Sequence, residues 1–189
     1  MHFGFEVIKI AILASIYAAI VLLIFSKIGN ANPDSWFKRV TEKKKRFWFI
    51  NALLISVGLF TFMFTYWGDH GLGDGPRIPI GHGMRVENVN WTEYGYLEEI
   101  KTSDNKKIEM TMFRVENDKL VGNLDSWFYI YNNSYLMYDL ESKELVEFKT
   151  KNYYDKFALK NELPLSNELL TFSENYSRRW GGWRFWLLP

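Results

Sequence analysis

Two long apolar runs near the start of the chain limit what it can fold into more than any other feature. They cover residues 7–26 and 47–66, and the only charge within them is Lys9, close to one end of the first run. About twenty helical residues cross a hydrocarbon core of roughly 30 Å, because each residue adds about 1.5 Å. The sequence therefore predicts two transmembrane helices.

Basic residues crowd the short segment between the runs, residues 27–46. Loops of this kind stay cytoplasmic, so we expect a helical hairpin with its loop inside and both of its ends outside. The residues predicted to determine this topology are Lys38, Arg39, Lys43, Lys44, Lys45 and Arg46. Binding of anionic lipid or of a partner is a second interpretation of the same cluster.

A cleaved signal peptide is the competing interpretation of the first run, because the "GNA" that ends at Ala31 resembles a small-residue cleavage site. Cleavage there would leave the basic cluster outside the membrane, so the hairpin is favoured. Aromatic residues flank the second run, as they do at membrane interfaces. Trp48 stands at one end, and Tyr66 and Trp67 stand at the other.

The hairpin, residues 1–67, is followed by a Gly- and Pro-rich stretch, residues 68–83, which is predicted to be a rigid collar. Gly68 can end the preceding helix, and Pro76 cannot continue one. Metal binding is an alternative, although the His and Asp side chains here match no standard ligand spacing. The metal candidates are Asp69, His70, Asp74 and His82. No cofactor is expected.

Residues 84–189 are predicted to form a small exoplasmic α+β domain that begins with strands. Residues 84–97 and 106–117 alternate apolar with polar residues, as strands do. In the second of these, Ile108, Met110 and Met112 share one face before the pattern shifts at Phe113 and Val115, which indicates a bulge. Residues 127–148 divide into three short strands at "NNS" and "ESKE", which predicts an antiparallel β-meander.

Two C-terminal helices are predicted after the meander. The first covers residues 152–163, with Asn152 as its N-cap, and the second is capped by Ser166 and ends at Gly181. Apolar residues recur along the second helix at helical spacing, so that face is predicted to dock on the sheet. These residues are Leu169, Phe172, Tyr176 and Trp180.

The last residues alternate Arg with Trp, a composition that suits a membrane interface. The interface candidates here are Trp183, Arg184 and Trp186. The alternative is that these aromatic residues close the base of the domain core. We expect Trp183 in that core and Trp186 against lipid.

Composition excludes several classes of function. The chain has no Cys, which excludes disulfides, thiol catalysis and Cys-ligated metals. Its 23 Lys and Arg balance 22 Asp and Glu, which gives no reason to expect nucleic acid as a partner. The Gly-Lys-Ser/Thr of a P-loop and the Gly-x-Ser-x-Gly of a hydrolase are both missing from the sequence.

We therefore expect a non-enzymatic integral membrane protein whose partners are the lipid bilayer and another membrane or envelope protein, as in an accessory subunit of an envelope complex. An immunity-type inhibitor of an incoming toxin would need the same topology and is one alternative. A metal-binding or hydrolytic exoplasmic domain is the other. The Lys-, Asn-, Tyr- and Ile-rich composition favours the bacterial inner membrane, with both termini periplasmic and the loop cytoplasmic.

Overall fold

The computed structural model of the chain describes residues 2–68 and 75–189. The chain divides into two compact units, which are taken separately here. A helical unit comprises Met1–Gly68 with Trp183–Pro189, and a β domain comprises Asp69–Gly182.

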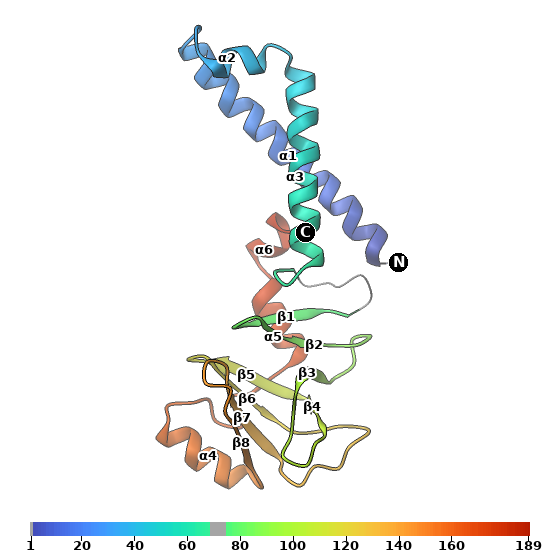
Figure 1. Cartoon of the computed structure of the whole chain (residues 1–189), viewed down its shortest axis with the longest axis vertical. Helices are drawn as coiled ribbons and strands as arrows, with labels where there is room; N and C mark the ends of the chain where they lie inside the picture. The colour runs from blue at the N-terminus through green and yellow to red at the C-terminus, as the bar shows by residue number, and fades with distance from the viewer. Residues whose placement is uncertain (1, 69–74) are drawn as a thin grey trace. The chain divides into compact units, whose positions relative to one another are not determined.

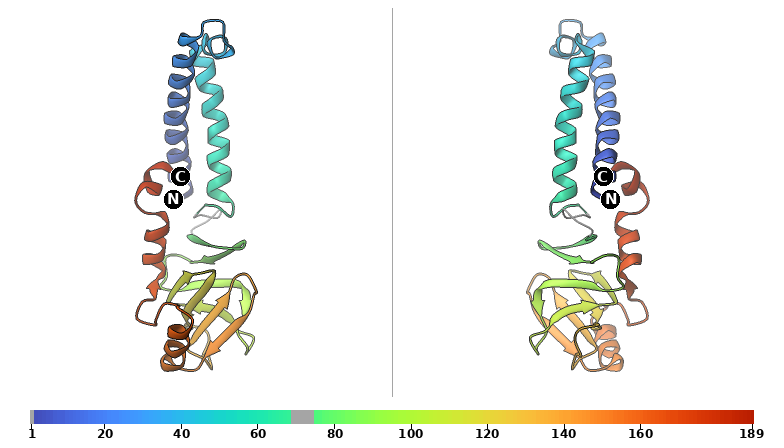
Figure 2. Two further views of the ribbon diagram at one scale, coloured as in Figure 1. Left: turned by 90° about the vertical axis from the view of Figure 1, so that its left-hand side faces the viewer. Right: turned by 90° about the vertical axis from the view of Figure 1, so that its right-hand side faces the viewer.

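The helical unit is built on two long helices that cross in Figure 1 and lie side by side in both views of Figure 2. Each is long and apolar enough to cross a membrane, with a mean hydropathy of 2.7 for the first and 2.0 for the second in their most apolar windows. The first continues past the predicted run until Pro33 prevents further helix. The helices of this unit are α1 (His2–Ala31), α2 (Trp36–Thr41), α3 (Lys44–Phe64) and α6 (Trp183–Leu187).

Small residues let α1 pack closely within this unit. Ala14 and Ala18, about one helical turn apart, are buried at 1 % and 0 % exposed, and Ile10, one turn before them, is 4 % exposed. Small side chains at this spacing allow close backbone approach. Trp48 of α3 donates its indole N–H to the Ser15 carbonyl of α1 at 3.3 Å. The two long helices therefore form a packed pair.

The described part of the β domain forms two antiparallel sheets, with strand orders β1-β2-β3-β4 and β8-β7-β6-β5-β9. The first sheet contains β1 (Arg77–Gly81), β2 (Met84–Glu87), β3 (Gly95–Lys101) and β4 (Lys107–Met110). The second contains β5 (Met112–Glu116), β6 (Lys119–Asn123), β7 (Tyr135–Asp139), β8 (Leu145–Phe148) and β9 (Leu170–Thr171).

The predicted strand over residues 106–117 crosses from one sheet to the other. It divides at Thr111, so that β4 belongs to the first sheet and β5 to the second. The Asn123 side chain holds this crossing, because it accepts from the Met112 amide and donates to the Thr111 hydroxyl, both at 2.7 Å. The shift in the apolar pattern at Phe113 therefore marks a change of sheet.

One hydrophobic core contains apolar residues from both sheets, and a second lies between the second sheet and α4 (Lys151–Lys160). Neighbouring residues of β6 serve different cores, because successive side chains of a strand point to opposite faces. Leu120 belongs to the first core and Val121 to the second. Tyr154 of α4 is fully buried in the second core and donates its hydroxyl to the Pro164 carbonyl.

The collar differs from its prediction, because the first sheet already begins at Arg77. β1 and β2 form a hairpin in which Gly81 pairs with Met84. The two residues between them, His82 and Gly83, have φ values of 51° and 78°. Positive φ at both central positions is the mark of a type I′ hairpin turn, which glycine-rich sequence favours. The second half of the collar is therefore part of the sheet.

Two predicted helix caps are wrong. α4 begins after Thr150, and Asn152 lies inside its first turn. Ser166 does not cap a helix. It lies in a turn between the two C-terminal helices of the β domain, and its amide and hydroxyl donate to the Asp155 carboxylate. The last helix of the β domain, α5 (Phe172–Trp180), is capped by Thr171 in a capping box with Glu174. Pairing of β9 with β5 holds residues 170–171 extended, so the helix starts later than its periodicity predicts.

The apolar stripe of α5 does dock on the domain. Phe172 and Trp180 are 2 % and 7 % exposed, and the Trp180 indole N–H donates to the Arg77 carbonyl of β1 at 2.9 Å. The expectation that Trp183 enters the domain core is wrong, because Trp183 belongs to the helical unit and is 62 % exposed. α5 ends at Gly181 and Gly182 has a φ of 63°, so the stripe stops at Trp180.

Candidate functional site: an exposed apolar loop

Residues 125–133 form a compact surface loop that connects β6 to β7. Its two ends are held together by the Leu124 amide, which donates to the Ser134 carbonyl at 2.9 Å. Compact loops whose ends lie close together are frequently functional. The prediction of a strand from Trp127 is wrong here, because strands begin again only at Tyr135.

The base of this loop covers β4, the edge strand of the first sheet. The Asp125 amide donates to the Glu109 carbonyl at 3.1 Å, and the Glu109 amide donates to the Tyr131 hydroxyl at 3.1 Å. That hydroxyl in turn donates to the Lys107 carbonyl at 2.7 Å. An exposed strand edge presents unpaired backbone groups. The loop satisfies these groups and is positioned by them.

A buried carboxylate organises the inside of the loop. Glu109 is 4 % exposed, and its side chain accepts a hydrogen bond from the Ser126 hydroxyl. The Ser126 oxygen also accepts from the amides of Phe128 at 2.9 Å and Tyr129 at 3.1 Å. Burial of a carboxylate is costly unless hydrogen bonds compensate it. Glu109 and Ser126 therefore fix the backbone of the loop where its aromatic residues begin.

Lys106 holds the far side of the loop. Its ammonium group donates to the Ile130 carbonyl at 2.5 Å and pairs with the Asp104 carboxylate. Hydrogen bonds from Lys106 and Thr102 lower the pKa of Asp104 below its ordinary value. Burial raises the pKa of Tyr131 to about 12, so this hydroxyl stays protonated at neutral pH.

Three apolar side chains project from this fixed backbone into solvent. Trp127, Phe128 and Ile130 are 79 %, 80 % and 90 % exposed. Tyr129 lies between them and packs against Tyr131, with ring centroids 6.2 Å apart. A loop that is already ordered loses little conformational entropy on binding. The arrangement is therefore suited to contact another apolar surface.

Three of the six predicted topology residues line one groove, and the other three do not. Lys44, Lys45 and Arg46 line one groove together with Trp48. The other three topology residues, Lys38, Arg39 and Lys43, do not line this groove. Lys38 donates to the Asn30 side chain at 3.0 Å, and Arg39 and Lys43 are exposed.

The other interface candidates lie in two further parts of the helical unit. Tyr66 and Trp67 follow α3, with their rings 5.1 Å apart, and Trp67 is 63 % exposed. Trp183, Arg184 and Trp186 lie on α6, where the Arg184 guanidinium stands 5.4 Å from the Trp183 ring.

Of the metal candidates, only His82 lies among the described residues, and Asp69, His70 and Asp74 lie outside them. The His82 Nε2 lies 3.4 Å from Asp118 Oδ1. Within residues 2–68 and 75–189, no group of three or more His, Cys, Asp or Glu side chains could hold a metal ion.

The sequence contained a signal for the loop that strand periodicity obscured. Five consecutive aromatic or apolar residues, 127–131, do not alternate with polar ones, and Asp-Ser precedes them while Asn-Asn follows. Such polar pairs are typical of loops. Comparison with protein-family models, curated proteins and solved structures finds no match for this chain. The function is therefore argued from the site itself.

Proposed function

We propose that this protein is a two-pass membrane protein that holds its β domain on the exoplasmic side and binds a partner protein through loop 125–133. The observation that carries the proposal is the fixed backbone of this loop, which presents Trp127, Phe128 and Ile130 almost fully exposed. Aromatic side chains of this kind supply much of the binding energy at protein interfaces. The role is that of a non-enzymatic accessory subunit of an envelope complex.

The surfaces of α1 and α3 support membrane insertion. A core helix of a water-soluble protein is mostly buried, whereas these helices expose large apolar side chains along their length. Ile8, Leu23 and Leu54 are 60 %, 69 % and 64 % exposed. Such surfaces are stable in hydrocarbon and unfavourable in water.

The contacts of α6 fit the same environment. The Tyr17 hydroxyl of α1 donates to the Leu187 carbonyl, and the Lys9 ammonium lies 4.9 Å from the Phe185 ring. α6 therefore packs along α1 between Lys9 and Tyr17, a part of α1 that we propose lies in the membrane, and its aromatic residues are held against that helix.

The charges around loop 125–133 favour a protein over a membrane as its partner. The acidic Asp104 and Asp125 stand at its edge, beside the basic Lys106 and Lys107. Segments that bind anionic membranes are dominated by Lys and Arg. An apolar centre with a polar edge of mixed sign is typical of protein interfaces.

Photo-cross-linking in intact membranes tests the partner. A photoreactive residue that replaces Phe128 is expected to form one discrete protein adduct, and Trp127→Ser with Ile130→Ser in the same chain is expected to abolish it. The control is the same photoreactive residue in place of Leu159 on α4, which is 68 % exposed. Adducts with lipid alone at position 128, or equal protein adducts at both positions, would overturn the proposal.

Reporter fusions test the orientation. A reporter fused after Pro189 is expected to be active only outside the cytoplasm, and one inserted near Asn30 only inside, because the basic loop sets the topology. Cytoplasmic activity of the Pro189 fusion would contradict the proposed placement of the β domain. A bacterial inner membrane, with the β domain in the periplasm, is the location we propose.

A further inference from the structure

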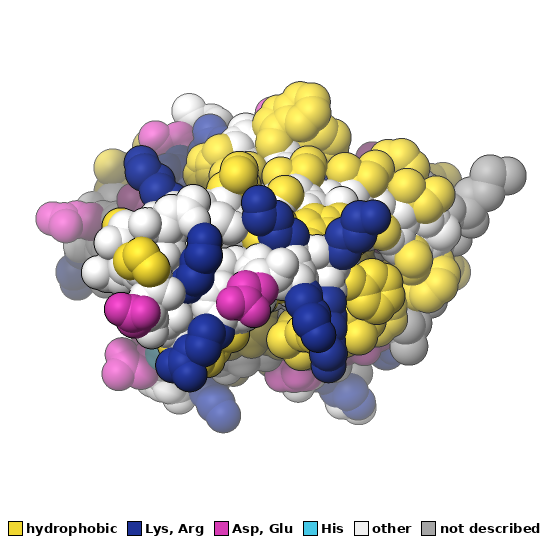
Figure 3. All heavy atoms as spheres, turned by 90° about the horizontal axis from the view of Figure 1, so that it is seen from above, with side chains coloured by type: hydrophobic (Ala, Val, Ile, Leu, Met, Phe, Trp, Pro, Cys, Tyr) yellow, Lys and Arg dark blue, Asp and Glu magenta, His cyan; other side chains and the backbone are white. Residues whose placement is uncertain are grey.

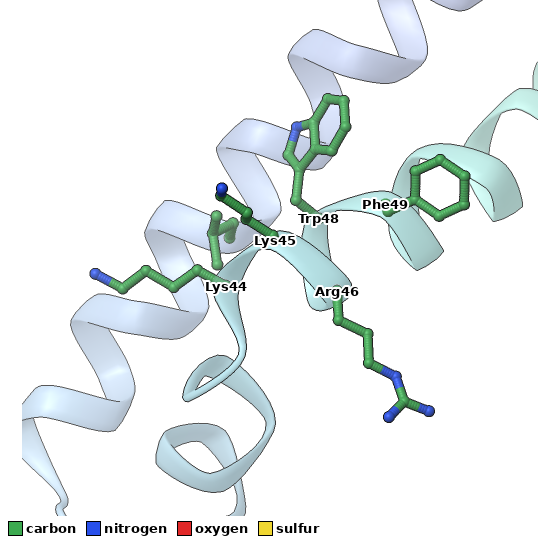
Figure 4. Close-up of a pocket in the computed structure, with 6 residues that line it drawn as sticks. Lys44, Lys45, Arg46, Trp48 and Phe49 are labelled. Atoms are coloured by element: carbon green, nitrogen blue, oxygen red, sulfur yellow. The ribbon is translucent and has the colours of Figure 1, made fainter.

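A groove of about 610 Å³ lies in the helical unit where α3 begins. The residues that line it are Leu22, Lys44, Lys45, Arg46, Trp48 and Phe49. Figure 4 shows Lys44 and Lys45 extending on the side of α1 and Arg46 pointing away from them. Two ammonium groups therefore stand at one side of the groove.

The wall of the groove is apolar and partly fixed. The Trp48 indole is held by its hydrogen bond to the Ser15 carbonyl of α1. Phe49 is 64 % exposed, and Leu22 of α1 is half-buried. Indole and aliphatic surfaces at the start of a membrane helix suit the upper part of an acyl chain.

The charge of the groove has one sign. Among its described lining residues there is no Asp or Glu. α3 begins after Lys43, which makes no side-chain capping hydrogen bond, so the positive end of the helix dipole adds to the lysines. Figure 3 looks down on the end of the helical unit that carries α2 and shows several Lys and Arg side chains beside hydrophobic ones, with fewer acidic side chains among them. The groove therefore complements a ligand that is both anionic and apolar.

We propose that this groove binds one anionic phospholipid, with its phosphate held by Lys44 and Lys45 and its acyl chain against Leu22, Trp48 and Phe49. The proposal rests on the membrane insertion proposed above. It differs from a role in topology, because topology depends on the total basic charge of the loop, whereas the groove requires these two lysines. A soluble phosphate ion would leave the apolar wall uncovered.

Native mass spectrometry of the full chain in mild detergent tests this site, with phosphatidylglycerol and phosphatidylcholine as probes. We expect one phosphatidylglycerol to bind about tenfold more tightly than phosphatidylcholine, and Lys44→Gln with Lys45→Gln to remove this preference. The matched control is Arg39→Gln with Lys43→Gln, which removes the same charge from the same loop. The control is expected to keep the preference.

Equal loss of the preference in both double variants would show unspecific attraction and overturn the proposal. So would a wild-type chain that binds both lipids equally. Alkaline carbonate extraction of cell membranes separates this result from the proposed function. A chain that resists extraction but shows no lipid preference refutes the groove alone, whereas a chain released by carbonate refutes membrane insertion.

Discussion

The two units of this chain differ in how far their large apolar side chains are exposed. The helical unit exposes them along the whole length of α1 and α3, whereas the β domain buries most of them in two cores. Among the described residues of the β domain, the most exposed apolar side chains are Trp127, Phe128 and Ile130, all in one loop. Exposure along an entire helix pair supports a lipid environment. Exposure at one ordered point of a packed domain supports a specific contact.

The sharpest contrast lies between two tryptophans on either side of Gly181–Gly182. Trp180→Ala is expected to cost the β domain about 3–5 kcal/mol, because it empties a buried site and leaves the Arg77 carbonyl without its donor. Hydrogen exchange of β1 and α5 peptides in the full chain, measured in detergent, reports this loss. Trp183→Ala is the control and should leave the exchange of those peptides unchanged. An equal effect of the two substitutions would contradict the division between the units.

The loop is expected to depend on one hydroxyl at its base. Tyr131→Phe removes the hydroxyl that pairs with both the Glu109 amide and the Lys107 carbonyl, and leaving the part-buried Glu109 amide without a partner costs about 1–3 kcal/mol. The measurement is the free energy of unfolding of the β domain, together with hydrogen exchange within residues 125–133. Tyr129→Phe, which removes a hydroxyl from the same loop, should change the free energy by less than about 0.5 kcal/mol. Equal costs for the two variants would show that the loop is not held at Tyr131.

Alkaline titration of the Tyr131 hydroxyl tests the same contact in the wild-type chain. The pKa of Tyr131 is raised above the ordinary value of 10 to about 12, so its contribution to stability is complete below pH 10 and is lost as the pH rises toward 12. The difference in absorbance at 295 nm between wild type and Tyr131→Phe should therefore rise near pH 12. A rise near pH 10 would mean that this hydroxyl is solvated and the loop is open.

The smallest change in the free energy of unfolding is expected for a substitution in the β1–β2 turn. His82→Asn removes an exposed contact with Asp118, which is worth little at a surface, and Asn tolerates the φ of 51° found there. We expect the free energy of unfolding to change by less than about 0.5 kcal/mol. His82→Val is the comparison, because a β-branched residue is strained at positive φ and should destabilise the hairpin. A large loss with Asn would assign His82 a further role.

Features that depend on neighbouring residues along the chain could be predicted from the sequence. The two apolar helices follow from run length and composition. Alternation identifies the regions of β2 to β5, although residues 88–94 interrupt the strand predicted over 84–97, and β1, β6 and β9 were not predicted. The pattern shift at Phe113 was visible as well, although its meaning as a change of sheet was not. The caps at Asn152 and Ser166 were predicted wrongly, because strand pairing at residues 170–171 delays α5 and a turn uses Ser166 elsewhere.

The candidate sites depended on contacts between distant parts of the chain. Sequence identified Trp48 and Lys44 as interface and topology residues, but their common groove needs Leu22 from another helix. The sequence predicted a strand over residues 127–131, because nothing local shows that Glu109 is buried beneath Ser126. Local periodicity determines which residues share a face of an element. Which elements face each other is decided by packing and by the pairing of buried polar groups, and these join residues that the sequence does not bring together.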